Sequence, residues 1–382
     1  MAGDLVVGLD AREAFRFQPR GIGLYGRHLI REFGALCPEV RFKLYHEHER
    51  PADLPELPAN MEPVRATIRG YRWHLWERLL MPWHMQRDGL SVYHGTYNTL
   101  PPRWRARPPM VVSIHDVIVT WFDDSLDDDY VRYCRKVTTR VVRQAARILT
   151  VSEWSRRDIV ERFGADPDKV AVFYNGIHPD FLAGAPPGAG DDARQRFAGG
   201  QPYLFAIGAP LPRKNTAGML AALGALHARR PLEHLVLVSG LAEAQRAPFA
   251  QAARDAGIAE RVRFLPYVDR RDLVALYAGA DLSIYPSRVE GWGIPVIESL
   301  SQGTPVVTAR TSGMLEAGGD DASYFDPNDR DSMVEGIAAA LDGRQAFTAR
   351  REAAIARART FTWRRAAEVT LATYRAVATE AL

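Results

Sequence analysis

The sequence predicts an α/β protein with two doubly wound parallel-sheet domains, and three observations carry this prediction. Short apolar runs of strand length alternate with helical patterns along most of the chain, as in sheets built from βαβ units. The chain has 382 residues, which is more than one hydrophobic core usually serves. A Gly-, Pro- and Ala-rich stretch at 183–200 interrupts the alternation, so we interpret it as a linker between domains at 1–182 and 201–360. Two such domains are expected to face each other across a cleft.

The expected elements follow from the periodicity of apolar residues. The apolar run 5–10 predicts a buried first strand, and 21–36 predicts a helix that opens at a glycine turn. Further strands are predicted at 40–46, 111–119, 147–152, 169–175, 203–208, 234–240, 261–268, 282–287 and 305–309. Further helices are predicted at 131–146, 155–164, 216–230, 244–257, 272–280, 332–343 and 363–382.

Composition narrows the class of protein. The net charge of +3 reflects 49 basic against 46 acidic residues, a balance that does not indicate a nucleic-acid partner. The two cysteines, Cys37 and Cys134, form no disulfide framework and no CxxC pair. The first residues lack the pattern of a signal peptide, and no apolar stretch is long enough to span a bilayer. We therefore expect a cytoplasmic protein, with the inner face of the membrane as an alternative location.

One motif, EGWGIPVIE at 290–298, has the residues of a nucleotide-sugar site. It follows the predicted strand 282–287 and leads into a helix with Pro295 in its first turn. Glycines in such a turn let backbone N–H groups approach an anion, and the helix N-terminus adds partial positive charge. Glu290 and Glu298 are suited to accept hydrogen bonds from sugar hydroxyls. Each glutamate alone is more often solvated, but the whole unit predicts a diphosphate sugar as ligand.

Two cations follow the first strand of the predicted second domain. Arg213 and Lys214 come after a turn that contains Gly208. Cations aimed at a departing nucleoside diphosphate stabilise the bond-breaking transition state more than the ground state. An isolated Arg–Lys pair is usually a solvated helix start, but this position and the resemblance described next favour phosphate binding. No DxD-like acidic pair accompanies them, so we expect no metal.

These segments resemble family 4 of the retaining glycosyltransferases, which have the GT-B fold. The similarity in the second domain runs through PRKN at 212–215, EGWGIPVIE and the segment that follows it. It continues more weakly in the first domain through GIGLYGRHL, VYHGTYNTLP, SIHDV and LTVSEWSRRDI. The opening segments most resemble a branch with many mannosyltransferases of lipopolysaccharide and exopolysaccharide synthesis. The resemblance implies an N-terminal acceptor domain, a C-terminal donor domain and a final helix, 361–382, that packs back on the first domain.

The resemblance also assigns roles to residues. In such enzymes the first glutamate of the motif contacts the donor sugar and the second the ribose. A histidine after a buried strand contacts the sugar, although a lone histidine there is often only a satisfied polar residue. Trp292 stands where the family usually has Phe, which bears on the shape of the sugar pocket. The expected catalytic residues are Glu290, His115, Arg213 and Lys214, and the expected donor-binding residues are Gly21, Gly23, Gly208, Arg213, Lys214, Val268, Glu290, Gly291, Trp292, Gly293, Ile294 and Glu298.

The segment 70–87 mixes three tryptophans with basic residues. This pattern is typical of an interfacial helix at an anionic membrane, and equally of a partly buried helix on the first domain. Its place in the expected acceptor domain would suit a lipid-linked acceptor.

The predicted reaction moves a hexose from a nucleoside diphosphate to a saccharide or lipid-linked saccharide, keeping the α configuration without a metal. The resemblance favours GDP-mannose over UDP-sugars, and no residue reads the base unambiguously. A non-catalytic nucleotide-sugar binder, or a scaffold of polysaccharide assembly, is the competing interpretation.

Overall fold

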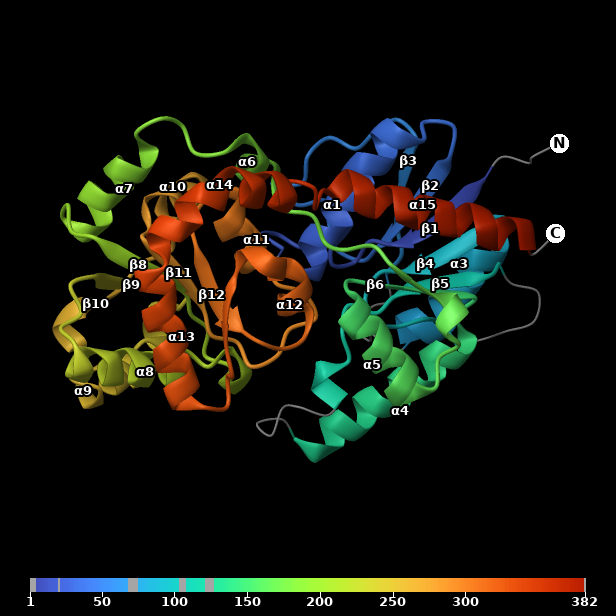
Figure 1. Ribbon diagram of the computed structural model, residues 1–382. Coiled ribbons are helices and arrows are strands. Elements are labelled where there is room, and N and C mark those ends of the chain that lie inside the picture. The colour runs from blue at the N-terminus through green and yellow to red at the C-terminus, as the bar shows by residue number, and fades with distance from the viewer. Residues whose placement is uncertain (1–4, 20, 68–74, 103–107, 121–126, 381–382) are drawn as a thin grey trace. The chain divides into compact units, whose positions relative to one another are not determined.

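The computed structural model describes residues 5–19, 21–67, 75–102, 108–120 and 127–380. Within these ranges the chain forms two compact units, each built on one parallel sheet (Figure 1). The first unit comprises the described residues up to 176 together with 363–380, and the second comprises 177–362. The two doubly wound sheets confirm the predicted fold class.

The sheet of the first unit has seven strands in the order β3-β2-β1-β4-β5-β6-β7, and every pairing is parallel. Its strands are β1 (Val6–Asp10), β2 (Arg41–His46), β3 (Met61–Arg65), β4 (Val92–Gly95), β5 (Met110–Ser113), β6 (Arg147–Thr150) and β7 (Val170–Val172). The helices are α1 (Ile22–Leu36), the π-helix η1 (Trp76–Leu80), α3 (Met81–Arg87), the short 3₁₀ turns η2 (Ile118–Thr120) and η3 (Pro167–Lys169), α4 (Asp128–Gln144), α5 (Glu153–Phe163) and α15 (Trp363–Glu380).

The second sheet has six strands in the order β10-β9-β8-β11-β12-β13, again all parallel. Its strands are β8 (Tyr203–Ile207), β9 (Leu235–Ser239), β10 (Val262–Phe264), β11 (Leu282–Tyr285), β12 (Val306–Ala309) and β13 (Ser323–Phe325). The α-helices are α6 (Pro179–Ala183), α7 (Ala189–Ala198), α8 (Thr216–Arg229), α9 (Ala247–Asp255), α10 (Arg270–Gly279), α11 (Ile294–Ser301), α12 (Gly313–Gly318), α13 (Arg330–Asp342) and α14 (Arg344–Ala358). Short 3₁₀ turns lie at η4 (Pro212–Lys214), η5 (Glu243–Gln245), η6 (Ala259–Arg261) and η7 (Gly319–Asp321).

Central strands of both sheets are buried along their whole length, which explains why they appear in the sequence as continuous apolar runs. In each sheet the strand order reverses direction at one point, between β1 and β4 in the first and between β8 and β11 in the second. Open α/β sheets bind ligands outside the carboxyl ends of the strands at such a switch point. The topology alone therefore indicates two candidate positions for a ligand-binding site, one at the switch point of each sheet.

The final helix, α15, packs along α1 within the first unit (Figure 1). The ring of Trp363 stacks on His28 with centroids 4.6 Å apart, and Arg364 lies 3.2 Å from Glu32. Deeper in the unit, the hydroxyl of Tyr374 contacts Nδ1 of the fully buried His94. These contacts make residues 363–380 part of the first unit.

The structure differs from the sequence-based expectation in several segments. The stretch 183–200, expected as a linker, contains α7 and belongs to the second unit, which begins at Ile177. The face that α7 packs on α10 consists of small residues such as Ala193 and Ala198, and so lacks a strong apolar signal. The strand expected at 111–119 ends at Ser113 and is followed by the 3₁₀ turn at 118–120.

Three strands, β3, β4 and β13, were not predicted. β3 and β13 lie at sheet edges and are partly exposed, so they lack the apolar run of a central strand. β4 is buried but only four residues long, and it contains His94 and Gly95. Among the described residues, no helix has both the length and the hydropathy needed to cross a bilayer.

Candidate active site

The switch point of the second sheet brings together segments that are far apart in the sequence. β8 and β11 are neighbours in the sheet. The chain leaves β8 through Gly208 and reaches Arg213 and Lys214 in η4, and it leaves β11 through the loop that holds Glu290. The N–H of Arg288 donates to the carbonyl of Arg213 at 2.7 Å, and this hydrogen bond joins the two loops.

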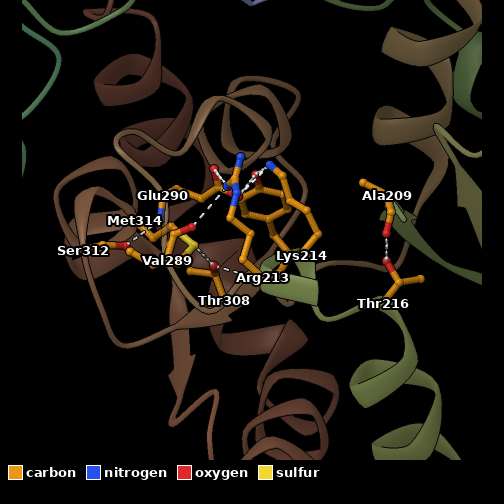
Figure 2. Close-up of polar contacts among 10 residues, drawn as sticks. Ala209, Arg213, Lys214, Thr216, Val289, Glu290, Thr308, Ser312 and Met314 are labelled. Atoms are coloured by element: carbon orange, nitrogen blue, oxygen red, sulfur yellow. Dashed lines mark hydrogen bonds and ion pairs between the residues drawn. The ribbon is translucent and has the colours of Figure 1, made fainter. Parts of the chain in front are cut away.

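The side chains of Arg213 and Lys214 converge on the carboxylate of Glu290 (Figure 2). Nη1 of Arg213 lies 2.8 Å from Oε2, and Nζ of Lys214 lies 2.6 Å from Oε1. The hydroxyl of Tyr285, the last residue of β11, donates to Oε1 of Glu290 at 3.0 Å and accepts from Lys214 at 3.0 Å. Three of the four expected catalytic residues therefore form one cluster.

The electrostatics of this cluster favour the charged forms. Burial opposes ionisation of Glu290, but the charges of Lys214 and Arg213 outweigh it and hold the pKa of Glu290 below its ordinary value. Burial would lower the pKa of Lys214, but Tyr285 and Glu290 raise it above its ordinary value. Two cations against one carboxylate leave a net positive charge, which suits an anionic ligand.

The backbone of Glu290 is held by the start of α12. Its N–H donates to Oγ of Ser312 at 3.0 Å (Figure 2). Its carbonyl accepts from the N–H of Gly313 at 3.2 Å. Ser312 has φ of 56° and ψ of −158°, a conformation rarely adopted by residues other than glycine. Such strain, next to a candidate catalytic glutamate, indicates that the position of Glu290 is tightly constrained.

Sequence reasoning missed Tyr285 and Ser312. Tyr285 could have been found, because the last residue of a strand that precedes the motif lies at the ligand-binding edge. Ser312 gave no such signal, since its contact with Glu290 spans 22 residues and depends on the tertiary fold.

Gly208 lies at the carboxyl end of β8, where a side chain has no room. An added Cβ would lie 2.8 Å from Cγ1 of Val238, so glycine is needed for packing. The next residue, Ala209, is fixed by Thr216, whose hydroxyl accepts from the N–H of Ala209 at 3.1 Å. The same hydroxyl donates to the carbonyl of Ala209 at 3.2 Å (Figure 2). The turn before Arg213 is thereby tied to the first residue of α8.

Glu298 lies in the middle of α11 and is only 7% exposed. Burial raises its pKa to about 7, against the opposing effects of Arg270 and Tyr277 of α10. A carboxyl group with this pKa changes charge near neutral pH, unlike Glu290. The two glutamates of the motif therefore have different environments although they are eight residues apart in the sequence.

The turn from Gly291 to Ile294 is packed closely. An added Cβ on Gly293 would lie 2.9 Å from Cβ of Ala317. Trp292 is 6% exposed, and its ring meets that of Phe361 edge-on at 5.0 Å. The indole therefore packs in the interior of the second unit, and its effect on a ligand would pass through the backbone of the turn.

Val268, expected near the base of the donor, lies in the loop after β10 and is partly buried. Its neighbour Tyr267 is 86% exposed. Neither side chain takes part in the cluster around Glu290.

The first unit holds the remaining expected residues. His115 follows β5, and its Nε2 donates to the carbonyl of Thr96 at 3.2 Å. Burial lowers its pKa to about 4, so the ring is neutral at physiological pH. Gly21 begins α1 with φ of 49°, a conformation that favours glycine. A Cβ on Gly23 would lie 2.6 Å from the carbonyl oxygen of Glu13, so this glycine permits close packing.

The segment 70–87 is described from residue 75, so Trp73 lies outside the described residues. Trp76 is buried, with Arg12 stacked over its ring at 3.8 Å, whereas Leu79 and Trp83 are about half exposed. Trp76 thus belongs to the core, and the apolar surface of the described part is limited to two side chains.

Two family models match the chain in succession. The model described as Glycosyltransferase Family 4 matches residues 19–181, and the model described as Glycosyl transferases group 1 matches residues 190–361. The boundary between the matches falls close to the boundary between the two structural units.

Individual proteins agree with these models. The chain is 27% identical over 381 residues to the O-antigen chain mannosyltransferase B of Escherichia coli, an alignment that covers 96% of this chain and 98% of that protein. It is 32% identical over 253 residues to D-inositol 3-phosphate glycosyltransferase 2 of Catenulispora acidiphila, covering 62% of this chain and 57% of that protein. A solved glycosyltransferase from Rickettsia africae has the same fold, with a TM-score of 0.73 at 13% identity and coverage of 98% and 99%.

The fold and these matches define a class, the glycosyltransferases of the GT-B fold. The chain belongs to this class: its first domain matches Glycosyltransferase Family 4, and its second domain matches Glycosyl transferases group 1. These matches confirm the resemblance found in the motifs.

Proposed function

We propose that the protein is a retaining glycosyltransferase that transfers a mannosyl residue from GDP-mannose to a saccharide or lipid-linked saccharide. The observation that carries the proposal is the cluster of Arg213, Lys214 and Glu290 at the switch point of the second sheet. The two cations can stabilise the diphosphate as it departs, and Glu290 can accept hydrogen bonds from the donor sugar. Mannose is favoured by the relative named as an O-antigen chain mannosyltransferase, which matches nearly the whole chain.

In the proposed reaction, the bond between C1 of the sugar and the diphosphate oxygen breaks as the acceptor oxygen attacks from the same face. The departing phosphate oxygen takes the proton of the acceptor hydroxyl, and the product keeps the α configuration. Arg213 and Lys214 supply the positive charge at the leaving group, so the proposal requires no metal. Glu298 would accept hydrogen bonds from the ribose, and the neutral His115 would contact the sugar.

The proposed setting is the cytoplasmic face of a membrane that carries the acceptor. Leu79 and Trp83 are the exposed apolar side chains that would contact its surface, and Arg87 lies 4.4 Å from the ring of Trp83. This surface is small, so the proposal is a peripheral and reversible contact.

A transfer assay with Glu290→Gln tests the function. This variant keeps the volume of the side chain but removes the charge opposite two cations, and we expect loss of transfer with retained fold. Glu335→Gln, on the exposed face of α13, is the matched control and should transfer normally. Full activity of a folded Glu290→Gln variant would contradict the site.

A thermal-shift panel of GDP-, UDP-, ADP- and dTDP-sugars tests the donor. A ligand at about a hundred times its Kd stabilises by about 2.7 kcal/mol, so the preferred donor should be evident. If only a UDP-sugar stabilises the protein, then the donor is that UDP-sugar and not GDP-mannose. Donor binding without slow donor hydrolysis or transfer would favour the competing interpretation, a non-catalytic binder.

A further inference from the structure

We propose that three exposed tyrosines of the first unit, Tyr97, Tyr130 and Tyr133, form the surface on which a sugar ring of the acceptor stacks. We call this surface the tyrosine face. The inference rests on the proposed function and deepens it, because it identifies what the acceptor must present: a neutral saccharide ring.

The tyrosine face begins at the switch point of the first sheet. Tyr97 is the second residue after β4, which lies beside β1 where the strand order reverses. The hydroxyl of Thr96 donates to the carbonyl of Asp10, the last residue of β1, at 2.6 Å. The loop that carries Tyr97 therefore lies over the carboxyl ends of both strands, where α/β sheets bind ligands.

The same loop is fastened to His115 on both sides of Tyr97. The carbonyl of Thr96 accepts from Nε2 of His115 at 3.2 Å, and Oδ1 of Asn98 accepts from the N–H of His115 at 3.0 Å. Asn98 has φ of 47°, and its own N–H donates to the carbonyl of Ser113 at 3.0 Å. Tyr97 is thus held next to His115, while its side chain is 36% exposed.

α4 supplies the other two rings. Tyr130 and Tyr133 are three residues apart, so they share a face of the helix, and they are 50% and 44% exposed. Burial raises the pKa of Tyr130, and the side chains of Cys134, Tyr97 and Tyr133 raise it further. Nη2 of Arg140, farther along α4, donates to the carbonyl of Leu100 at 3.2 Å and joins the helix to the loop after β4.

Charged groups lie at the edge of the tyrosine face. Burial and the charge of Glu77 raise the pKa of Tyr133, whereas the charges of Arg140 and Arg78 lower it. Arg140 and Glu77 form an ion pair at 3.8 Å, and Glu77 belongs to the π-helix η1. π-helical turns are frequent at functional sites. Because Glu77 is buried, the guanidinium of Arg140 is the donor at this edge, and the tyrosine hydroxyls can both donate and accept hydrogen bonds.

A saccharide ring matches this combination. Its C–H bonds form an apolar face that can lie on an aromatic ring, while its hydroxyls donate and accept hydrogen bonds at the edge. A phosphate group could accept hydrogen bonds from the guanidinium groups and the tyrosine hydroxyls, but it has no apolar face to lie on the aromatic rings. A membrane surface could also meet exposed tyrosines near arginines, but it would not need them at a switch point beside His115.

Saturation-transfer NMR on the full chain, with methyl α-mannoside and an α-linked mannobiose as probes, tests the proposal. We expect both to bind the wild type, and binding by Y130A/Y133A to weaken by about tenfold or more, since each aromatic contact contributes to affinity. Y130F/Y133F keeps the rings and should bind within about twofold of the wild type. Phe17→Ala, an exposed aromatic of the first unit outside the tyrosine face, is the matched control and should bind normally.

Undiminished glycoside binding by the folded double alanine variant overturns the proposal, and so does absence of binding by the wild type. Reduced association of that variant with anionic phospholipid vesicles, with glycoside binding intact, also overturns it and assigns the tyrosines to a membrane surface. The stabilisation of the double variant by GDP-mannose reports separately on the second unit. If the glycosides bind through the tyrosines while Glu290→Gln remains active, the tyrosine face stands and the proposed catalytic cluster fails.

Discussion

The ammonium group of Lys214 lies 2.6 Å from Oε1 of Glu290, and the hydroxyl of Tyr285 contacts both groups. Because Arg213 takes the other carboxylate oxygen, Glu290 is ionised and fixed in place without a ligand. A diphosphate that binds at the switch point would contact two cations that the carboxylate of Glu290 already holds in position. Preorganised charge of this kind contributes to catalysis because little reorganisation is needed during the reaction.

Lys214→Met tests the catalytic part of this arrangement. The substitution keeps an apolar stem but removes the charge that faces the leaving group, so we expect kcat/KM to fall by about a hundredfold or more. Steady-state kinetics of transfer from GDP-mannose measure kcat/KM for the variant and the wild type. Lys169→Met, at an exposed turn of the first unit, is the control and should be unaffected. Wild-type kcat/KM in a folded Lys214→Met variant would exclude Lys214 from the reaction.

If Glu298 binds the ribose as proposed, its pKa should make donor binding depend on pH. Burial raises this pKa to about 7, so the carboxyl is mostly protonated at pH 6 and mostly ionised at pH 8. Hydrogen bonds from ribose hydroxyls to an ionised carboxylate are stronger than those to a neutral acid. We therefore expect the Kd for GDP-mannose to decrease as pH rises from 6 to 8, as measured by calorimetric titration. Glu298→Gln should weaken binding and remove the pH dependence, and a pH-dependent variant would show that another group is responsible.

How much of the fold could be predicted depended on burial. The strands β8 and β11 are buried along nearly all of their length, so their apolar residues form unbroken runs that periodicity detects. β3 was missed because its residues Glu62 and Pro63 are exposed at the sheet edge. The sequence predicts a linker where α7 forms, because the buried residues of this helix are Ala193 and Ala198, and alanine carries little apolar signal.

In the candidate site, too, the features that depend on neighbouring residues could be predicted, and those that depend on tertiary contacts could not. Glu290 and Glu298 were predicted from one contiguous motif whose turn and helix form as expected. The ion pair of Arg213 with Glu290 joins residues 77 positions apart, so no local spacing in the sequence predicts it. The hydrogen bond from Glu290 to Ser312 and the exposure of Tyr97, Tyr130 and Tyr133 follow from tertiary packing, so no spacing in the sequence predicts them.

Two buried histidines should make the first unit sensitive to acid. Burial lowers the pKa of His94 to about 3 and that of His115 to about 4, whereas in the unfolded chain both titrate near 6.5. Between pH 6.5 and 4 the unfolded state binds protons that the folded state does not, so acid favours unfolding. The free energy of unfolding should fall by up to about 1.4 kcal/mol per histidine for each pH unit below 6.5.

Chemical unfolding at pH 7.5 and 5.0 measures this loss. His94→Gln removes one titrating group together with its contacts to Ser113 and Tyr374, so it should be less stable at pH 7.5 but lose less stability on acidification. An equal loss of unfolding free energy in the wild type and His94→Gln would show that His94 is not held neutral, because other groups, such as Glu298, titrate alike in both proteins.

Gly313 should control donor binding through the backbone of Glu290 and Gly291. An added Cβ would lie 2.2 Å from the carbonyl oxygen of Gly291 and 3.0 Å from Cα of Trp292, so Gly313→Ala must displace the turn of the motif. The N–H of Gly313 also donates to the carbonyl of Glu290, which ties this displacement to the glutamate. We expect the Kd for GDP-mannose to rise by about tenfold or more, corresponding to about 1.4 kcal/mol, while the fold persists.

Calorimetric titration and a thermal melt of Gly313→Ala separate these effects. Gly343→Ala is the matched control, because Gly343 ends α13 with φ of −80° and its added Cβ would lie 3.0 Å from the nearest heavy atom. This control should bind GDP-mannose as the wild type does. If Gly313→Ala also binds with wild-type affinity, then the packing of α12 against the motif does not determine the geometry of the donor site.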